Sequence, residues 1–520
     1  MKYQKLIIED LIERRIKNSS DLAVFKRRIS KKYKILTPSN IQLLKAYHEL
    51  ARKKSIKKSK AIEELLKTRP IRSLSGIVNI SVLTKPYPCP GKCIYCPLEK
   101  GLPKSYLSGE PAVQRAKALN FDPYNQTKQR IKMLRQAGHP TDKIDFRVIG
   151  GTWSYYPKNY QTRFIKRCFD ACNKKTSNNL TQAQKLNESA KHRIIGLSVE
   201  TRPDFINENE IKRLRNLGIT KVELGVQSTD DNVLKLNLRG HKVKETIKAT
   251  KLLKNAGFKI SYQIMPNLLG STPKKDIKSI KTIFSDERFR PDLIKIYPCA
   301  LVKEAPLYRL YKKGKYRPYS LKVLIKILCE IKKQIPYYTR IERIIRDIPA
   351  PKIVKGPVKI SNLREVVGEQ LEKQGYKCKC IRCREIKAKY DSKEKIYLFR
   401  EDYNASGGKE IFLTFENKNR TKLYSLLRLR ILSGKMFLPV LRNSAIIREI
   451  HTYGQLIPIS KKGASAQHKG LGKKLIQKAE NITENEFGLK KITVISAVGA
   501  RGYWRKFNYK LKETYMVKLL

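Results

Sequence analysis

The chain has 520 residues, of which 41% are hydrophobic and 8% aromatic, enough for two to four domains and at least one large core. Its 112 Lys and Arg against 45 Asp and Glu give a formal net charge of +67. Such a charge repels itself unless a polyanion neutralises it, so nucleic acid is the predicted partner. The alternative explanation for part of the charge excess is a proteome that is rich in lysine. No run of 18 apolar residues and no signal-peptide pattern occur, which predicts no membrane span. Most of the ten cysteines fall outside any disulfide framework, so we expect a cytoplasmic protein.

Residues 1–70 are predicted to form a small basic helical module. They carry twenty Lys or Arg against seven Asp or Glu, and the segments 6–12 and 41–47 have helical apolar spacing. A basic run at 26–28 lies between these segments, and a second at 52–58 follows them. We expect the module to bind the phosphates of tRNA, whereas solvated helix faces are the alternative.

Residues 71–345 alternate between strand-like and helix-like segments, which predicts an α/β fold with a parallel sheet. Six such units predict a (βα)6-type partial barrel with its chemistry at the carboxyl ends of the strands. The strand-like runs are 77–83, 146–149, 194–199, 221–226, 259–265 and 293–297, and the helix-like segments between them include 125–136, 208–217 and 243–256.

Three cysteines, Cys89, Cys93 and Cys96, follow the first predicted strand in a C-x3-C-x2-C spacing. Three thiolates of this kind can ligate three irons of a 4Fe-4S cluster and leave the fourth iron open. An open iron is what S-adenosylmethionine needs to be cleaved to a carbon radical. The alternative is a structural zinc knuckle, but no fourth Cys or His lies nearby to complete a tetrahedron. The motif therefore predicts a radical S-adenosylmethionine (radical SAM) site.

Other strand ends supply candidates for binding S-adenosylmethionine. Gly150, Gly151 and Thr152 follow the second strand and allow the backbone to approach a cofactor closely. Glu200 follows the third strand and Gln227 the fourth. Hydrogen bonding within the barrel is the alternative role for each.

Residues 346–395 are predicted to be a linker that contains a second cysteine cluster. Cys378, Cys380 and Cys383 are soft ligands at a spacing that suits zinc, with Cys299 or water as the fourth ligand. Free thiols in a basic loop are the alternative. Cys168, Cys172 and Cys329 are expected to be core residues.

Residues 396–520 form a separate predicted domain. The run 467–472, Q-x-x-G-x-G, precedes a predicted helix from 473 to about 486 and follows a strand near 446–452. Backbone N–H groups and the helix dipole at such a point bind pyrophosphate. With a strand at 492–496 and a short helix at 503–507, the pattern resembles the coenzyme A loop of GCN5-related acetyltransferases (GNAT). Tyr503 is a candidate catalytic proton donor, and packing against the cofactor is its alternative role.

The combination of both domains on one basic chain resembles the catalytic subunit of Elongator, the tRNA wobble-uridine acetyltransferase family. The matching stretches are 201–204, 223–228, 237–241, 346–349, 428–430, 448–454 and 515–518. The resemblance implies a radical SAM tRNA acetyltransferase that acts on the anticodon stem-loop. In this family a radical derived from S-adenosylmethionine is thought to activate the methyl group of acetyl-CoA for addition to C5 of the wobble uridine, and hydrolysis leaves a carboxymethyl group.

The resemblance also implies an acetyl-CoA site. Family members contact this substrate through a barrel lysine that matches Lys143, a strand segment that matches 450–453, and the loop before the helix. The family usually has two tyrosines where this chain has Tyr503 and Trp504, so tyrosine chemistry here must rest on Tyr503 or be absent. The implied set is Lys143, Ile450, His451, Thr452, Tyr453, Gln467, Lys469, Gly470, Leu471, Gly472, Lys473, Tyr503 and Trp504.

Two other functions compete with tRNA modification. One is a protein lysine acetyltransferase with a structural cluster, against which the charge of +67 argues because its substrates are themselves basic. The other is a non-catalytic tRNA-binding scaffold, which the retained glycines and cysteines disfavour. The choice of tRNA, the need for accessory subunits and homodimerisation stay open.

Overall fold

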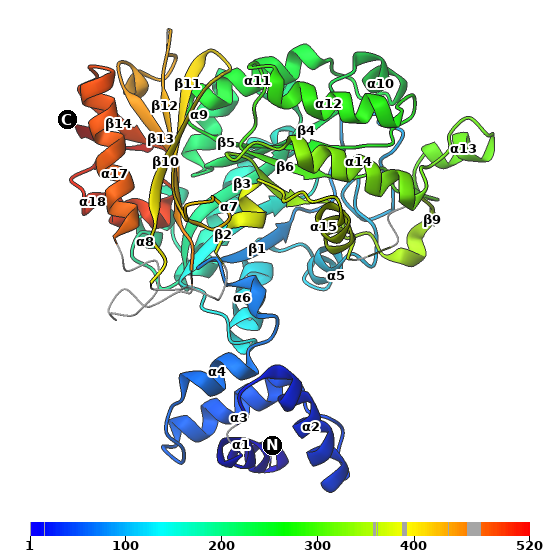
Figure 1. Ribbon diagram of the computed structural model, residues 1–520, viewed down its shortest axis with the longest axis vertical. Helices are drawn as coiled ribbons and strands as arrows, with labels where there is room; N and C mark the ends of the chain where they lie inside the picture. The colour runs from blue at the N-terminus through cyan, green and yellow to red at the C-terminus, as the bar shows by residue number, and fades with distance from the viewer. Residues whose placement is uncertain are drawn as a thin grey trace.

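The computed structural model describes residues 2–14, 16–356, 360, 362–386, 393–434, 436–454 and 470–520. Four helices at the amino terminus form a small bundle, shown in blue at the bottom of Figure 1: α1 Lys2–Glu13, α2 Ser19–Lys32, α3 Asn40–Arg52 and α4 Lys60–Leu66. Ser39 and Gln42 form a capping box that starts α3. Ile7, Leu43 and Tyr47 are fully buried in the bundle's own apolar core.

The central sheet has seven parallel strands in the order β1-β2-β3-β4-β5-β6-β8. The predicted parallel half-barrel is therefore confirmed, with one strand more than the six predicted. The strands are β1 Val78–Leu83, β2 Lys143–Ile149, β3 Arg193–Thr201, β4 Lys221–Gln227, β5 Lys259–Ile264, β6 Leu293–Ile296 and β8 Arg340–Arg343. The sequence of β8, Arg-Ile-Glu-Arg, has one apolar residue and gave no strand signal.

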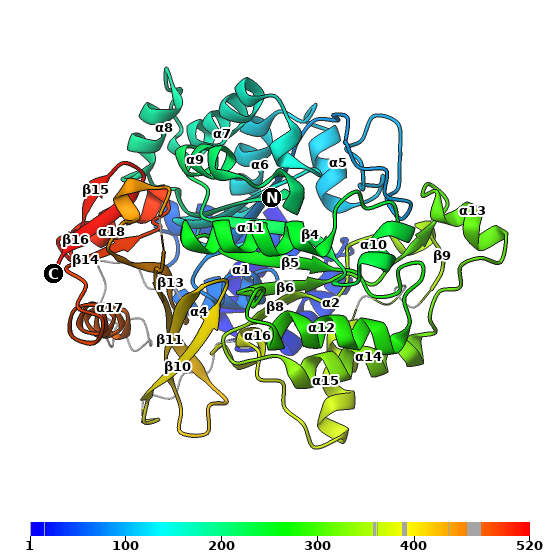
Figure 2. The same cartoon turned by 90° about the horizontal axis from the view of Figure 1, so that it is seen from above.

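Helices cover the outer face of this sheet and build its connections, and their apolar side chains share one large core with the strands (Figure 2). A two-stranded sheet pairs β7 Leu301–Val302 with β9 Ile353–Lys355. The helices are α5 Pro111–Lys117, α6 Pro123–Gln136, α7 Lys158–Asn173, α8 Leu180–Asn187, α9 Glu208–Asn216, α10 Asp231–Leu236, α11 Val243–Asn255, α12 Pro273–Ser285, α13 Leu307–Lys312, α14 Leu321–Gln334, α15 Leu363–Lys373 and α16 Ile381–Arg384.

The carboxyl-terminal part holds a second seven-stranded sheet in the order β10-β11-β12-β13-β14-β16-β15. Its elements are β10 Tyr397–Ala405, β11 Gly408–Glu416, β12 Leu423–Ile431, β13 Ala445–Thr452, α17 Leu471–Asn481, β14 Lys491–Val494, α18 Arg501–Arg505, β15 Lys510–Lys512 and β16 Tyr515–Leu519. Neighbouring strands are antiparallel except β13 and β14, whose parallel pairing covers only Ala445 to Ile447 of β13. The last residues of β13 therefore extend past β14 and line a gap in the sheet.

The second sheet lies against the amino-terminal ends of the barrel strands. In Figure 2 it is on the left, whereas α10 and α13 are at the opposite ends of the strands on the right. Arg448 of β13 forms ion pairs of 2.5–2.9 Å with Asp292, directly before β6, and with Glu410 of β11, and all three side chains are buried. His451 contacts the carbonyl of Ser75, before β1, through Nε2 at 3.0 Å. The two sheets are thus joined by buried polar contacts as well as by apolar packing.

None of the helices in the described part of the chain combines the length and the apolarity that a membrane span requires.

Candidate active site

The loop between β1 and α5 brings Cys89, Cys93 and Cys96 to the carboxyl edge of the half-barrel. Cys93 is buried and the other two are half-buried. Arg239 places Nη1 3.6 Å from Sγ of Cys93. The pKa of Cys93 is lowered to about 4, first by the hydrogen bond from the Cys96 thiol and then by Arg239, against burial, which raises it. Cys93 is therefore favoured as a thiolate, the form that ligates metal, whereas the same hydrogen bond and burial raise the pKa of Cys96.

The two cysteine clusters differ in the spacing of their sulfurs. Within the described residues, three sulfurs lie within 4.8 Å of one another only at Cys378, Cys380 and Cys383, a separation that suits one shared ion. The sulfurs of Cys89, Cys93 and Cys96 do not all lie within that distance of one another, although the Cys93 and Cys96 thiols are close enough to share a hydrogen bond. Their C-x3-C-x2-C spacing on one loop is that of three thiolates that each ligate a different iron of one cluster.

The predicted cofactor-binding residues surround the same end of the barrel. Gly151, Thr152, Glu200 and Gln227 line one cavity with the three cysteines, whereas Gly150 packs against Thr84 behind it. Gln227 has a strained φ of 70°, and its buried Oε1 has no hydrogen-bond partner among the described residues. A strained residue with an unpaired buried acceptor indicates a ligand, because such groups are otherwise paired.

Buried Arg202 adds an unpaired donor at this end. Its Nη1 has no partner in the described part of the chain, and a Cβ added at Gly91 would lie 2.5 Å from that atom. The cysteine loop and the guanidinium thus approach each other closely only because position 91 is glycine. The residues present fit a cluster with a small polar cofactor beside it.

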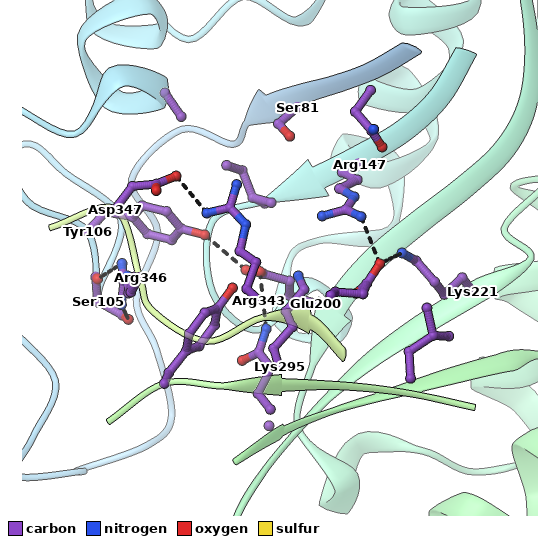
Figure 3. A pocket seen from close by; sticks show the side chains of 18 of the residues that line it. Ser81, Ser105, Tyr106, Arg147, Glu200, Lys221, Lys295, Arg343, Arg346 and Asp347 are labelled. Carbon is purple, nitrogen blue, oxygen red and sulfur yellow. Dashed lines mark hydrogen bonds and ion pairs between the residues drawn. The ribbon is translucent and has the colours of Figure 1, made fainter. Parts of the chain in front are cut away.

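The cavity has a volume of about 820 Å³ and extends through the barrel interior to β13, where Glu449, Ile450, His451 and Tyr453 line it. Its middle is lined by charged side chains rather than by the apolar layers of a closed barrel. Glu342 accepts from Arg147 at 2.8 Å and from Lys221 at 3.1 Å, as Figure 3 shows with dashed lines. The interior is therefore polar along its length.

Glu200 and Tyr106 lie further toward the cysteines, where both side chains point into the cavity (Figure 3). The Tyr106 hydroxyl donates to Glu200 Oε2 at 2.9 Å, and Gln263 donates to Oε1 at 3.2 Å. Burial raises the pKa of Glu200, although Lys295 nearby lowers it.

The predicted acetyl-CoA residues of β13, α17 and α18 meet at the gap in the second sheet. A Cβ added at Gly472 would lie 3.0 Å from the Tyr503 hydroxyl, 3.6 Å from Thr452 Oγ1 and 3.9 Å from Ile450 Cδ1. Gly470, with φ of 66°, is the N-cap of α17 and allows the chain to enter the helix. The first backbone N–H groups of α17 therefore begin beside the end of β13.

The other predicted residues of this group occupy different environments. Tyr503 is 40% exposed, and desolvation still raises its pKa to about 12, so its hydroxyl is protonated at neutral pH. Trp504 is buried in the apolar core of the second sheet, and Lys473 is exposed on the first turn of α17. Lys143 begins β2, at the barrel end that faces the second sheet, and burial lowers its pKa. Gln467 and Lys469 lie outside the described residues.

Cys378 and Cys380 lie between α15 and α16, Cys383 lies within α16, and the cluster is beside the barrel core. Cys299, considered as their fourth ligand, is instead buried in the apolar cluster that contains Cys93 and Tyr316. Desolvation raises the pKa of Cys299 to about 12, as expected for a thiol packed in a core.

Sequence reasoning missed the charged residues of the barrel interior and the arginines at the cysteine loop. The available signal was the spacing of charged residues along the strands. Side chains alternate between the two faces of a strand, so charged residues two positions apart point to the same face. Asp145 and Arg147 on β2 have this spacing, as do Lys221 and Glu223 on β4. Arg239 follows a helix and has no such pattern.

Comparisons with known proteins agree with this geometry. Residues 87–282 match the Radical SAM superfamily, and residues 291–373 match the Radical SAM C-terminal domain. A tRNA uridine(34) acetyltransferase of Methanocaldococcus infernus is 44% identical over 497 residues, 93% of this chain and 92% of that protein. Elongator complex protein 3 of Homo sapiens is 37% identical over 481 residues, 89% of this chain and 87% of that protein. A solved structure of the archaeal M. infernus Elp3 with an N-terminal deletion has a TM-score of 0.76 at 42% identity and covers 86% of this chain and 100% of that one.

Proposed function

Because the chain belongs to the family of tRNA uridine(34) acetyltransferases and Elongator complex protein 3, we propose that it modifies C5 of the tRNA wobble uridine with a group derived from acetyl-CoA. Membership of the radical SAM superfamily implies a 4Fe-4S cluster and S-adenosylmethionine. The product we propose is the carboxymethyl form that follows hydrolysis of the thioester.

The observation that carries the proposal is the shared cavity. Cys89, Cys93 and Cys96 line one end of it, and Ile450 and His451 line the other. An enzyme that joins radical chemistry to an acyl donor needs both reactants to reach one enclosed space. A scaffold or a protein acetyltransferase has no need of a polar passage between two such ends.

At the first end, the three cysteines would hold the cluster, and the pKa of Cys93 is lowered by its hydrogen bond with Cys96 and then by Arg239. Gln227 Oε1 and Arg202 Nη1 are an unpaired acceptor and an unpaired donor, suited to the amino and carboxylate groups of S-adenosylmethionine. When both are bound, the 4Fe-4S cluster and S-adenosylmethionine would supply carbon-radical chemistry.

At the other end, the amino terminus of α17 offers N–H groups to the pyrophosphate of acetyl-CoA, with Gly472 leaving space beside β13. We propose that Tyr503, whose hydroxyl lies beside Gly472 and is protonated at neutral pH, donates a proton to the leaving thiolate. Lys143 is a further contact on the barrel side. We also propose a structural zinc ion at Cys378, Cys380 and Cys383.

The test is anaerobic incubation with unmodified tRNA, S-adenosylmethionine, reductant and acetyl-CoA, followed by nucleoside mass spectrometry. We expect a carboxymethyl mass gain on the wobble uridine, and we expect Cys93→Ser to abolish it together with the absorption of the cluster. Labelled acetyl groups on protein but not on tRNA would instead favour the protein acetyltransferase. Modification by Cys93→Ser at the wild-type rate would exclude the radical mechanism.

A further inference from the structure

Three aromatic side chains, Tyr87, Tyr155 and Phe205, form an exposed group that we call the aromatic rim. Tyr155 is 40% exposed and the other two are half-buried. The ring centroid of Tyr155 lies 6.0 Å from that of Tyr87 and 5.9 Å from that of Phe205. The three residues come from the loops after β1, β2 and β3, so the fold gathers them from separate parts of the chain.

A second layer of aromatic rings supports the rim from within. Tyr156 stacks on Tyr87 at 4.9 Å, and Tyr160 stacks on Tyr156 at 5.2 Å. The Tyr156 hydroxyl donates to the carbonyl of Lys85 at 2.9 Å and lies 2.8 Å from Thr84 Oγ1. Tyr156 is buried, Tyr160 is half-buried, and the Tyr160 hydroxyl accepts from the backbone N–H of Lys85 at 3.1 Å. The rim therefore presents its exposed ring faces in a fixed orientation, and little side-chain entropy is lost on binding.

The rim stands directly beside the cysteine end of the cavity. Each of its residues lies two or three positions from a residue that lines the cavity, namely Cys89, Thr152 and Arg202. Two of these lining residues are in contact, since Cys89 Sγ lies 3.8 Å from Thr152 Oγ1. A molecule that enters the cavity from this edge therefore passes the rim.

The charge around the rim is positive. Lys85 places its ammonium 5.1 Å from the ring centroid of Tyr160, and Lys92 and Lys158 are exposed in the same loops. Asp204, the acid next to Phe205, is neutralised by Arg202 at 2.8 Å, and Glu99 and Glu110 in the loop after β1 pair with Lys352 and Arg346. Exposed ring faces flanked by lysines match a single-stranded nucleic acid, whose bases stack while its phosphates are neutralised. An apolar protein surface would leave these ammonium groups without partners.

We propose that the aromatic rim binds an unstacked nucleobase of the RNA that adjoins the base entering the cavity. This inference rests on the proposed function, because it assumes that the substrate is RNA. An enzyme that works on a base inside such a cavity must extract it from the stack, and the neighbouring base then loses a stacking partner. Tyr155 and Tyr87 replace that partner, and Lys85 contacts the adjoining phosphate.

The experiment uses the whole protein and an anticodon stem-loop RNA that carries 2-aminopurine beside the wobble uridine. Stacking on an aromatic ring quenches the fluorescence of this base, so wild type should quench it on binding. Stacking contributes about 1–3 kcal/mol per base, so Tyr155→Ala should weaken RNA binding by about 5- to 150-fold and remove the quenching. Tyr155→Phe should retain both, and Tyr87→Ala should repeat the loss independently. Tyr397→Ala is the matched control, since Tyr397 is 41% exposed on β10.

Two outcomes would overturn the inference: no quenching by wild type, or equal affinity and quenching for Tyr155→Ala and wild type. Because binding needs neither cluster nor acetyl-CoA, this test is separate from that of the proposed function. Quenching that depends on Tyr155 without any modified nucleoside would support the rim and reject the function. Modification with an unchanged KM for RNA in Tyr155→Ala would support the function and reject the rim.

Discussion

Arg448→Met tests whether the two sheets are held together by buried charge. Arg448 is fully buried and donates to both oxygens of Asp292, to Glu410 and to the carbonyl of Phe258. Methionine keeps much of the apolar volume but removes the cation. Glu410 retains Arg430 at 3.0 Å, whereas the nearest other cations of Asp292 lie at 3.7 and 3.8 Å, beyond ordinary hydrogen-bond distance. In the variant, Asp292 keeps the hydrogen bond from the backbone N–H of Ile260 at 2.9 Å but has no hydrogen-bonded cation.

Loss of one partner of a buried ion pair destabilises a protein by about 3–5 kcal/mol, and we expect this loss in the free energy of unfolding. Urea unfolding can follow both parts of the molecule, because Trp153 lies in the barrel core and Trp504 in the second core. The matched control is Arg400→Met, which removes an ion pair with Asp402 on the surface of the second sheet. For this control we expect a loss in unfolding free energy of less than about 1 kcal/mol. A loss below about 1 kcal/mol for Arg448→Met would refute the reasoning.

The same pair predicts a pH dependence. Burial raises the pKa of Glu410, but Arg448, Lys254 and Arg430 outweigh it and lower the pKa to about 2 from an ordinary 4.5. The pKa of Asp292 is also held well below its ordinary range, chiefly by Arg448 against burial. The stability from these depressed carboxyls is therefore complete above pH 4.5 and is lost as pH falls toward 2. The difference in unfolding free energy between wild type and Arg448→Met should narrow across this window, and a widening would contradict the assignment.

Three further measurements follow. Gly472→Glu should lower acetyl-CoA affinity at least about tenfold by calorimetry, because the new side chain meets Tyr503 and repels pyrophosphate, whereas Gln477→Glu on the exposed side of α17 should not. Cys380→Ser should remove zinc but keep iron in metal analysis, with Cys329→Ser as the control, and retained zinc would reject that site. The affinity for tRNA should fall by about 10³–10⁵ between about 50 and 200 mM salt if six to ten phosphates are neutralised, and a flat response would exclude phosphate-driven binding.

The predictable parts of the fold are those whose sequence carries a periodic apolar signal. The run at 194–199 lies within β3, which is mostly apolar as expected for a buried parallel strand. The run at 221–226 lies within β4, where Val222, Leu224 and Val226 alternate with polar residues or glycine. The segment 340–343 is short and mostly charged, so β8 became evident only from its pairing with β6. The predicted helix from 473 to about 486 corresponds to α17 and a following π-helical turn at Ile482–Glu486.

The candidate site also has a part that local sequence motifs predict and a part that they do not. Motifs placed the cysteine triad and the α17 loop, because ligand spacing and glycine positions are local properties of a sequence. Long-range proximity was not predictable: Gly472 meets Tyr503 and Thr452, and Cys299 lies away from the Cys378 cluster, only through tertiary packing. The aromatic rim was missed for this reason, since its three residues come from three loops.

The charged barrel interior explains why an open sheet suits this chemistry. Eight strands would close a barrel and fill it with apolar layers, leaving no passage. Here seven strands leave the sheet open, and ion pairs such as Arg147–Glu342 and Lys221–Glu342 line the interior. Paired charges keep the space polar, while β13 lies across the amino-terminal end with Glu449 bound to Lys259 at 2.9 Å. Under the proposed function, the acyl donor would enter at one end and the RNA base at the other, so that two large substrates stay apart while their reacting groups share one cavity.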